Sequence, residues 1–134
     1  PITEYFTEDS PGATVDLTPA CLNKASKAVR TVRLDNDILN IVDNVITSTD
    51  TQVRWNMITK AQPQSDGDNK VILSSGSRKM LLEVVSPDTA LIYILPAEGG
   101  EGEAPNPDYM RVGFTAQLES GKEYELRVTL TPIQ

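Results

Sequence analysis

The chain has 134 residues, of which 12 are basic and 19 are acidic, so its net charge is −7. A chain of this length fits one domain that can bury a core of its own. The negative charge argues against nucleic-acid binding and against a surface that lies on an anionic membrane, and no apolar run is long enough to span a bilayer.

The N-terminal part of the chain contains the only candidate for a helix. We expect residues 1–11 to form an N-terminal segment, a candidate linker, and residues 12–134 to form a single β-sandwich domain. In the run TPACLNKASKA, Thr18 can cap a helix and Pro19 suits its first turn. This run therefore predicts at most one short helical turn, followed by a strand.

The central part of the chain reads as strands joined by turns. The runs VRTVRLD and ILNIVDNVIT are joined through Asn36 and Asp37, and the runs KVILS and RKMLLEVVS flank the turn SGS. Both patterns are hairpin signals. The runs RKMLLEVVS and ALIYIL are more uniformly apolar, which suits strands in the middle of two stacked sheets or strands with one face covered by a neighbouring domain.

The last two runs show the clearest alternation of apolar and polar residues. In YMRVGFTAQL and KEYELRVTLT every second side chain is apolar, and the link ESGK between them predicts a hairpin turn. The apolar positions are Met110, Val112, Phe114, Ala116 and Leu118 in the first run, and Tyr124, Leu126, Val128 and Leu130 in the second. In total we expect about eight or nine strands at hairpin spacing, so the predicted fold is an all-β antiparallel β-sandwich.

The only tryptophan lies in the strand-like run QVRWNMITKA. Trp55 shares its face with Val53 and Met57, whereas Arg54 and Asn56 take the other face. An indole flanked by apolar residues two positions away is more often buried than exposed, so the pattern favours a core position over a sugar-binding platform. The platform stays a candidate, because a β-bulge can reverse the faces of a strand.

Side chains that commonly carry catalysis are scarce. The sequence has no histidine, and its only cysteine is Cys21, which excludes a Cys/His dyad and a Cys/His zinc site. Ser74, Ser75 and Ser77 surround a glycine turn, but no histidine can activate their hydroxyls. We therefore expect no catalytic residue, no metal and no cofactor in this chain.

Two acidic groups are candidates for calcium ligands. One is Asp66 with Asp68 in SDGDNK, and the other comprises Glu98, Glu101 and Glu103 in PAEGGEGEAPNPD. The first lacks the bidentate acidic residue that an EF-hand loop needs. The second lies in residues 96–108, whose content of Gly, Pro and Glu predicts a mobile loop, so solvated acidic loops are the favoured interpretation of both groups.

Tyr109 and Arg111 are candidates for a carbohydrate-binding pair. They lie two positions apart on the polar face of one predicted strand. A tyrosine ring can stack on a sugar ring, and a guanidinium can hold the carboxylate of a uronic acid. Strands also place such pairs on solvent-facing surfaces with no ligand, and this alternative is favoured.

The order of the strands and turns resembles the C-terminal β region of heparinase II/III-like polysaccharide lyases. The resemblance is carried by the strand start VDLT, the strand with Arg30 that leads into ILNIVDNV, the strand VRWNMIT, and ILSSGSRKMLLEVVSP. It extends from about residue 12 to the end of the chain. In that family an α/α toroid precedes the β region and carries much of the polysaccharide cleft, and Tyr and His groups cleave the chain by β-elimination at a uronic acid.

The resemblance implies an accessory role. Because this chain contains neither the toroid nor a histidine, no catalytic residue of the family can be carried over. The implied function is that of a non-catalytic C-terminal structural domain of a lyase that acts on a uronic-acid-containing polysaccharide such as a glycosaminoglycan. The implied partners are the catalytic α/α toroid of the same parent chain and an acidic polysaccharide, and the implied location is periplasmic or secreted. Asp43 and Trp55 match recurring positions of the β pattern, for which a structural role is expected.

Each of the competing functions predicts a different surface. A domain that packs on a toroid should expose an apolar patch around residues 80–95. A carbohydrate-binding module should expose Trp55, Tyr93 or Tyr109 on a flat or concave face, with Trp55, Tyr109 and Arg111 as the first candidates. An unrelated adhesion or surface-assembly sandwich should show an open edge strand and should self-associate.

Overall fold

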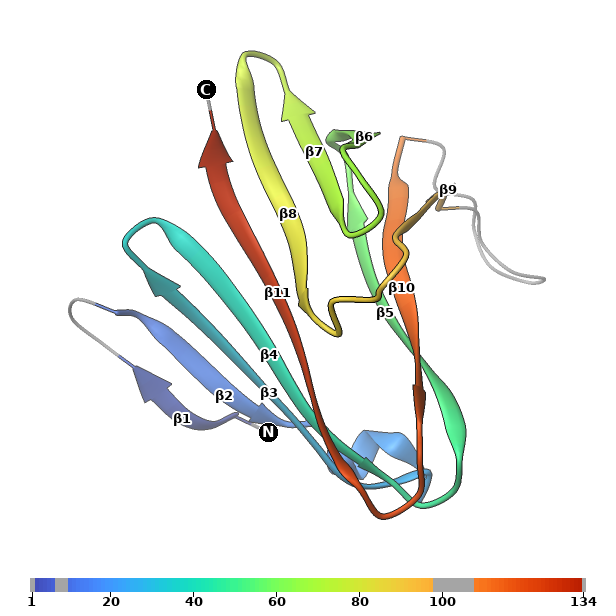
Figure 1. Cartoon of the computed structure of the whole chain (residues 1–134). Coiled ribbons are helices and arrows are strands. Elements are labelled where there is room, and N and C mark those ends of the chain that lie inside the picture. Colours follow the sequence, from blue (N-terminus) through green and yellow to red (C-terminus); the bar gives the residue numbers. More distant parts are fainter. Residues whose placement is uncertain (1, 7–9, 98–107, 134) are drawn as a thin grey trace.

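A computed structural model describes residues 2–6, 10–97 and 108–133 of the chain (Figure 1). In these ranges the protein is all β, with eleven strands in two antiparallel sheets and one short 3₁₀ turn, so the predicted fold class is confirmed. The elements are β1 (Ile2–Phe6), β2 (Gly12–Asp16), η1 (Thr18–Cys21), β3 (Ala25–Asp35), β4 (Ile38–Thr47), β5 (Thr51–Thr59), β6 (Gln62–Ser65), β7 (Lys70–Ser75), β8 (Arg78–Ser86), β9 (Tyr93–Pro96), β10 (Met110–Leu118) and β11 (Glu123–Ile133).

The two sheets differ greatly in size. The large sheet has the strand order β1-β2-β3-β4-β11-β8-β7-β6, and the small sheet has the order β5-β10-β9. The chain changes sheet between β4 and β5, between β5 and β6, between β8 and β9, and between β10 and β11. Consecutive strands therefore often lie in opposite layers.

For this reason the prediction of a hairpin at ESGK is wrong. The link joins β10 of the small sheet to β11 of the large sheet, and no ladder pairs these two strands. Gly121 has a φ of 75°, and its amide donates to the carbonyl of Thr47 at 2.9 Å. The amide of Ser120 donates to the carboxylate of Asp50 at 2.8 Å. These bonds tie the link to the β4–β5 connection, and the two connections close the sandwich at the bottom of Figure 1.

The other predicted turns are confirmed. Asn36 and Asp37, with φ of 49° and 66°, connect β3 to β4, which pair in register. Two successive residues with positive φ form the tight turn that matches the twist of a hairpin. The turn around Gly76, with a φ of 61°, joins the paired strands β7 and β8. The single helical turn before a strand is also present, as η1, but Thr18 is its first residue and not its cap, and the Thr18 hydroxyl accepts a hydrogen bond from the amide of Ala28 at 2.9 Å.

The N-terminal segment contributes to the large sheet. β1 pairs with β2, and the register joins Ile2 to Val15 and Tyr5 to Ala13. Together with the short strands β6 and β9, β1 brings the number of strands among the described residues above the eight or nine expected. The boundary between a linker and a domain at residue 12 stays a prediction. Across the described ranges, no helix is long and apolar enough to span a membrane.

The core fills the space between the small sheet and only half of the large one. Its members come from β5 and β10 on one side, and from β4, β7, β8 and β11 on the other. Phe114, Leu82 and Val128 are among its most deeply buried side chains. Neither the cluster nor its partly buried rim contains a residue of β1, β2 or β3. In Figure 1 these three strands lie beside the covered half rather than beneath the small sheet.

The inner face of β1–β3 is therefore mostly apolar and uncovered, except at Ala28 of β3, which is buried, and at Arg30 of β3, whose guanidinium lies 5.9 Å from the centre of the Trp55 ring. The register places Val32 beside Ile41 and Leu34 beside Leu39, on the face that carries the core in β4. Ile2, Tyr5 and Leu34 on this face are 49%, 70% and 39% exposed. The other apolar members of the face are Ala13, Val15 and Val32, which are half-buried.

The apolar patch expected around residues 80–95 is less continuous. Leu82 and Val84 lie in the core, whereas Val85, Leu91 and Leu95 are exposed. The exposed residues belong to β8, to the connection that follows it and to β9, so they do not share one sheet face. The continuous apolar face of the large sheet lies instead on β1–β3.

Candidate functional site

The outer face of the small sheet gathers the polar candidates. Tyr109 immediately precedes β10, and the ammonium of Lys60 lies 5.2 Å from the centre of its ring. Arg111 lies on β10 between Ile58 of β5 and Leu95 of β9. The alternation along β10 directs Arg111 away from the core, as the sequence predicts.

Tyr93 and Asn56 meet across the middle of the same face. Gly113 of β10 pairs with Asn56 on one side and with Tyr93 on the other, and the Tyr93 hydroxyl donates to the Asn56 side-chain oxygen. A Cβ on Gly113 would lie 2.7 Å from each of these two oxygens and 2.3 Å from the carbonyl oxygen of Trp55. The glycine therefore leaves the space in which the tyrosine side chain reaches across β10.

Trp55 points to the opposite side, into the core, as its neighbours in the sequence predict. It is 4% exposed and stacks on Phe114, with ring centres 5.7 Å apart and planes 16° apart. The guanidinium of Arg30 lies 5.9 Å from the centre of the Trp55 ring. An indole in this position presents no open face for a sugar ring to stack on.

Arg30 and Asp43 form the most enclosed ion pair among the described residues. Two parallel hydrogen bonds of 2.8 and 2.9 Å join the guanidinium to the carboxylate, on neighbouring strands β3 and β4. The side chain of Asp43 is 10% exposed and that of Arg30 is 34% exposed. The pair holds the arginine over the tryptophan, which gives Asp43 and Trp55 a structural arrangement of the kind the resemblance implies.

An open cavity of about 430 Å³ lies at the same end of the sandwich. Leu22 of the η1 region, Thr47 and Trp55 are among its lining residues, together with the Arg30–Asp43 pair. The hydroxyl of Thr47 and the indole nitrogen of Trp55 are buried and have no hydrogen-bond partner among the described residues. Both polar atoms belong to side chains that border the cavity.

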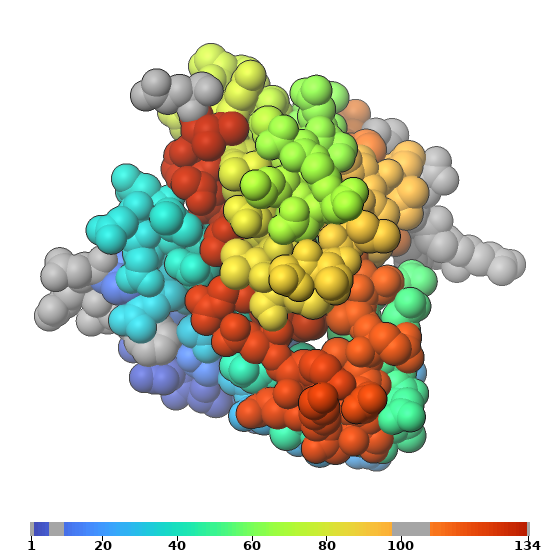
Figure 2. Space-filling view, in the orientation of Figure 1, coloured from blue at the N-terminus to red at the C-terminus, as the bar shows by residue number. Residues whose placement is uncertain are grey.

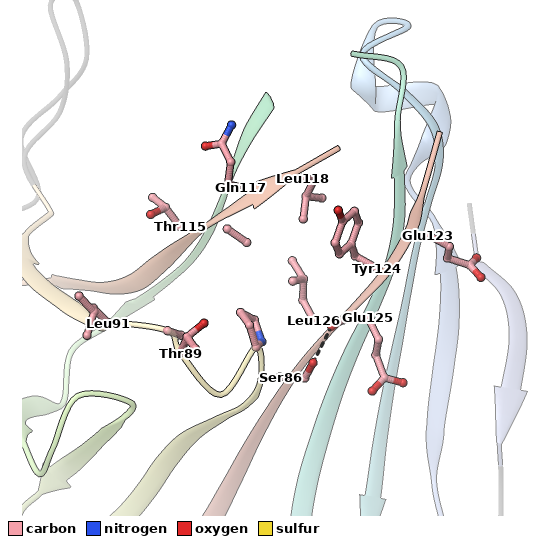
Figure 3. A pocket seen from close by; sticks show the side chains of 13 residues that line it. Ser86, Thr89, Leu91, Thr115, Gln117, Leu118, Glu123, Tyr124, Glu125 and Leu126 are labelled. Carbon is pink, nitrogen blue, oxygen red and sulfur yellow. Dashed lines mark hydrogen bonds between the residues drawn. The ribbon is translucent and has the colours of Figure 1, made fainter. Parts of the chain in front are cut away.

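A second cavity, of about 560 Å³, opens between the sheets on the side of the β8–β9 connection (Figure 3). Leu118, Tyr124 and Leu126 point into it, whereas Glu123 and Glu125 point outward. Ser86 donates from its hydroxyl to the carbonyl of Glu125 at 2.9 Å, so its hydroxyl proton is engaged. In Figure 2 the surface is hollowed between the segment near residue 90 and the residues of β10 and β11.

The chemistry available in this second cavity is limited. Tyr124 accepts a hydrogen bond from the amide of Glu119 at 3.1 Å, and the ammonium of Lys122 lies 5.5 Å from the centre of its ring. No nucleophile there is joined to a base by a hydrogen bond between described residues. The cavity is thus an apolar hollow where the two sheets diverge, without the paired groups that acid–base catalysis needs.

The acidic candidates for a metal site remain scattered in the described ranges. Asp66 and Asp68 lie in the exposed turn between β6 and β7, and no group of three or more potential ligands occurs in residues 2–6, 10–97 and 108–133. Glu98, Glu101 and Glu103 lie outside the described residues, as does most of the predicted mobile loop.

One carboxylate has a displaced pKa. Asp16, at the end of β2, accepts a hydrogen bond from the amide of Thr18 at 3.0 Å. The side chain and the amide of Thr18 both lower the pKa of Asp16, because they donate to its ionised form. The contact fixes the start of η1, so its role is local and structural.

The face on the small sheet includes three residues that were not singled out as a group from the sequence. Arg54 and Asn56 were placed opposite Trp55 by alternation, and Tyr93 was named only as an aromatic candidate. Cross-strand register brings them onto the same sheet face as Arg111, with Asn56 and Tyr93 beside Gly113 and Arg54 beside Thr115, and register between distant strands is not readable from local patterning. The local signal that could have pointed to Arg54 and Asn56 is their position on the polar side of the tryptophan strand.

The solved structures that match this architecture include a heparan sulfate lyase and two heparinase III structures. Heparan sulfate lyase HepC from Pedobacter heparinus matches with a TM-score of 0.77 and 13% identity. The match covers 100% of this chain and 22% of the HepC chain. This chain has the fold of a heparinase III-like lyase domain. A crystal structure of heparinase III matches with a TM-score of 0.76 and 10% identity, over 99% of this chain and 21% of its own. Another heparinase III gene product matches with a TM-score of 0.76 and 17% identity, over 98% and 21%.

The likeness concerns the fold and covers only part of each lyase. The chain spans about a fifth of the length of these heparinase III-like structures. No sequence-family model matches the chain, and no curated protein matches its sequence. The predicted resemblance to the β region of these lyases is confirmed at the level of the fold.

Proposed function

We propose that the chain is the non-catalytic C-terminal accessory domain of a larger polysaccharide lyase. The parent enzyme would cleave a uronic-acid-containing polysaccharide by β-elimination, with its catalytic residues in the remaining part of the protein. The observation that carries the proposal is the match of nearly the whole chain to about a fifth of each lyase structure. A periplasmic or secreted location belongs to the same proposal.

The arrangement of polar groups supports a non-catalytic role. β-elimination needs a base near the acidic hydrogen of the uronic acid and groups that stabilise the resulting negative charge. In the described part of the chain, Tyr124 lies in an apolar hollow and Tyr93 is bonded to Asn56. Neither tyrosine is joined to a base by a hydrogen bond that the structure describes.

The uncovered half of the large sheet supports an accessory role. A sheet with one apolar face is stable when that face is buried against another layer. The small sheet buries this face over β4, β11, β8 and β7 but leaves it open over β1, β2 and the part of β3 that carries Val32 and Leu34. Tyr5 and Leu34 stand exposed there, at 70% and 39%. The occupant we propose is the catalytic α/α toroid of the same parent chain, because matching lyases carry a further four-fifths of their length beside this fold.

A charge placed on this face tests the proposal. Leu34→Asp should lower the free energy of unfolding of the isolated chain by only about 1 kcal/mol, because the side chain is already partly solvated there. The same substitution in the full-length parent should lower its unfolding temperature and its release of unsaturated uronate, because the charge would be buried at the contact.

Val85→Asp is the matched control. Val85 is 42% exposed on β8 and its neighbour Val84 lies in the core, so Val85 points to the outer side of the large sheet. It should be tolerated both in the isolated chain and in the parent. If Leu34→Asp leaves the parent as stable and as active as Val85→Asp does, β1–β3 are not a contact surface. Concentration-dependent dimerisation through Leu34 would instead assign the face to a second copy of the chain and would contradict the proposal.

A further inference from the structure

The outer face of the small sheet is built as regular rows of side chains. The register places Lys60 beside Tyr109, then Ile58 beside Arg111, then Asn56 and Tyr93 on either side of Gly113, then Arg54 beside Thr115. Successive rows are two residues apart along the strands, which corresponds to about 7 Å. The face therefore alternates cationic rows with rows that contain a tyrosine, over about 20 Å from Lys60 to Arg54.

The charge of this face is opposite to that of the whole chain. The chain contains 19 acidic residues, yet β5, β9 and β10 contain none. Arg54 and Arg111 form no ion pair with any acidic side chain among the described residues. At physiological ionic strength the screening length is about 8 Å, so acidic groups on the large sheet act weakly on a ligand at this face. Asp108 lines a hollow together with Lys60 at the Tyr109 end of the face, and Asp50 precedes β5 at the other end.

The tyrosine in the middle is held in a fixed position. The hydrogen bond to Asn56 anchors the Tyr93 hydroxyl, and Gly113 keeps the space beneath this contact open. A side chain ordered in the free protein loses little further conformational freedom when a ligand stacks on it. The Asn56 side chain also has amide hydrogens, which can donate to hydroxyl or carboxylate oxygens of a ligand.

We propose that this face binds a linear anionic polysaccharide. One sugar ring would stack on Tyr93, and carboxylate or sulfate groups on sugars to either side would be held by Arg111 and Arg54, whose rows lie about 14 Å apart. Lys60 and Tyr109 would add ligand contacts at one end of this row of binding residues. This site does not depend on the proposed contact of β1–β3, because it lies on the other sheet and faces away from the core. Of the three carbohydrate-binding candidates from the sequence, the proposed site includes Tyr109 and Arg111. Trp55 is buried, and Tyr93 takes its place as the stacking residue.

Calorimetric titration of the whole chain with heparan sulfate, hyaluronan, alginate and neutral dextran tests this site. Hyaluronan and alginate carry carboxylates only, so they separate recognition of carboxylate from recognition of sulfate. Saturable binding to at least one anionic glycan, with none to dextran, is expected. The double variant Arg54→Gln/Arg111→Gln should weaken that binding at least tenfold, because two charge-assisted contacts are lost.

The double variant Arg78→Gln/Arg127→Gln is the matched control. It removes the same charge from β8 and β11 of the large sheet, so it reproduces the change in net charge without touching the small sheet. It should bind the glycan as wild type does. Equal weakening by the two double variants, or the absence of saturable binding by wild type to any anionic glycan, would overturn the proposal. Circular dichroism establishes that each variant is folded.

Single-stranded DNA is the competing polyanion. Aromatic rings between cationic side chains also bind single-stranded nucleic acids, by base stacking. Oligothymidylate should bind this chain more weakly than the best anionic glycan, because Tyr109 and Tyr93 lie two rows apart with Arg111 between them and leave successive bases no continuous set of rings to stack on. Binding of oligothymidylate as tight as that of the glycan would assign the face to nucleic acid and would overturn the proposal.

Discussion

The two halves of the large sheet are joined by the hydrogen bonds between β3 and β4, but the small sheet covers only one of them. Over β4, β11, β8 and β7 the inner face meets the small sheet, and side chains such as Leu82 and Val128 are almost fully buried. Over β1–β3 the same face carries Val32, Leu34 and Tyr5 without a covering layer. Apolar alternation thus continues beyond the part of the sheet that this chain can bury. The uncovered half is the feature that a larger protein would complete.

The strongest test of this comparison removes a core side chain from the covered half. Phe114→Ala should lower the free energy of unfolding by about 3–5 kcal/mol, because Phe114 is 1% exposed and stacks on Trp55. Val32→Ala on the uncovered half should cost less than about 1 kcal/mol in the isolated chain. Urea denaturation of both variants measures the difference. Equal losses would mean that the β1–β3 face is buried in the free chain.

The ion pair between the two halves should give an intermediate effect. Arg30→Met leaves the carboxylate of Asp43 enclosed without its partner, and it also removes the cation over Trp55. Because Arg30 is one-third exposed and water can reach the site, we expect a loss of about 1–2 kcal/mol rather than the cost of a fully buried charge.

A further substitution tests the cause of this loss. Asp43→Asn in the Arg30→Met background should recover part of the stability in urea denaturation, because the unpaired charge is removed. A double variant less stable than Arg30→Met would show that the carboxylate has other stabilising contacts.

The smallest expected effect concerns pH and the uncovered half. Thr18 lowers the pKa of Asp16 in the folded chain, so the contact stabilises the fold at pH values above the ordinary pKa of aspartate, about 3.9. This contribution should disappear as the pH falls through the lower, folded-state pKa. Carbon-detected NMR titration should show Asp16 titrating below the ordinary value, and Asp16→Asn should be slightly less stable than wild type at neutral pH but not below both pKa values. An ordinary pKa for Asp16 would contradict the contact.

Local patterning predicted the strands better than their partners. The alternation in β10 and β11 and the turn at Asn36 and Asp37 gave correct faces and a correct hairpin. The link before β11 has the same kind of turn residues, yet it crosses between sheets. Turn residues determine the local path of the chain, whereas the choice of sheet depends on how distant apolar faces pack.

The same limit applies to the candidate sites. The neighbours of Trp55 were sufficient to place it in the core, because alternation is a property of one strand. The row that joins Asn56, Gly113 and Tyr93 needs three strands in register, two of which follow the first by more than thirty residues. The open inner face of β1–β3 was missed for a related reason, since the sequence shows which residues are apolar but not which of them the small sheet covers.

Hydrogen exchange of the backbone amides would show whether the rest of a larger protein covers the open half of the large sheet. The amides of β2 and β3 would be followed in the isolated chain and in the full-length parent, with those of β7 and β8 as an internal reference. We expect exchange in β2 and β3 to slow markedly in the parent, whereas the covered strands change little, because the proposed domain contact buries only the open half of the sheet. Equal exchange of β2 and β3 in the two proteins would contradict the proposal that this face is completed by the rest of a lyase.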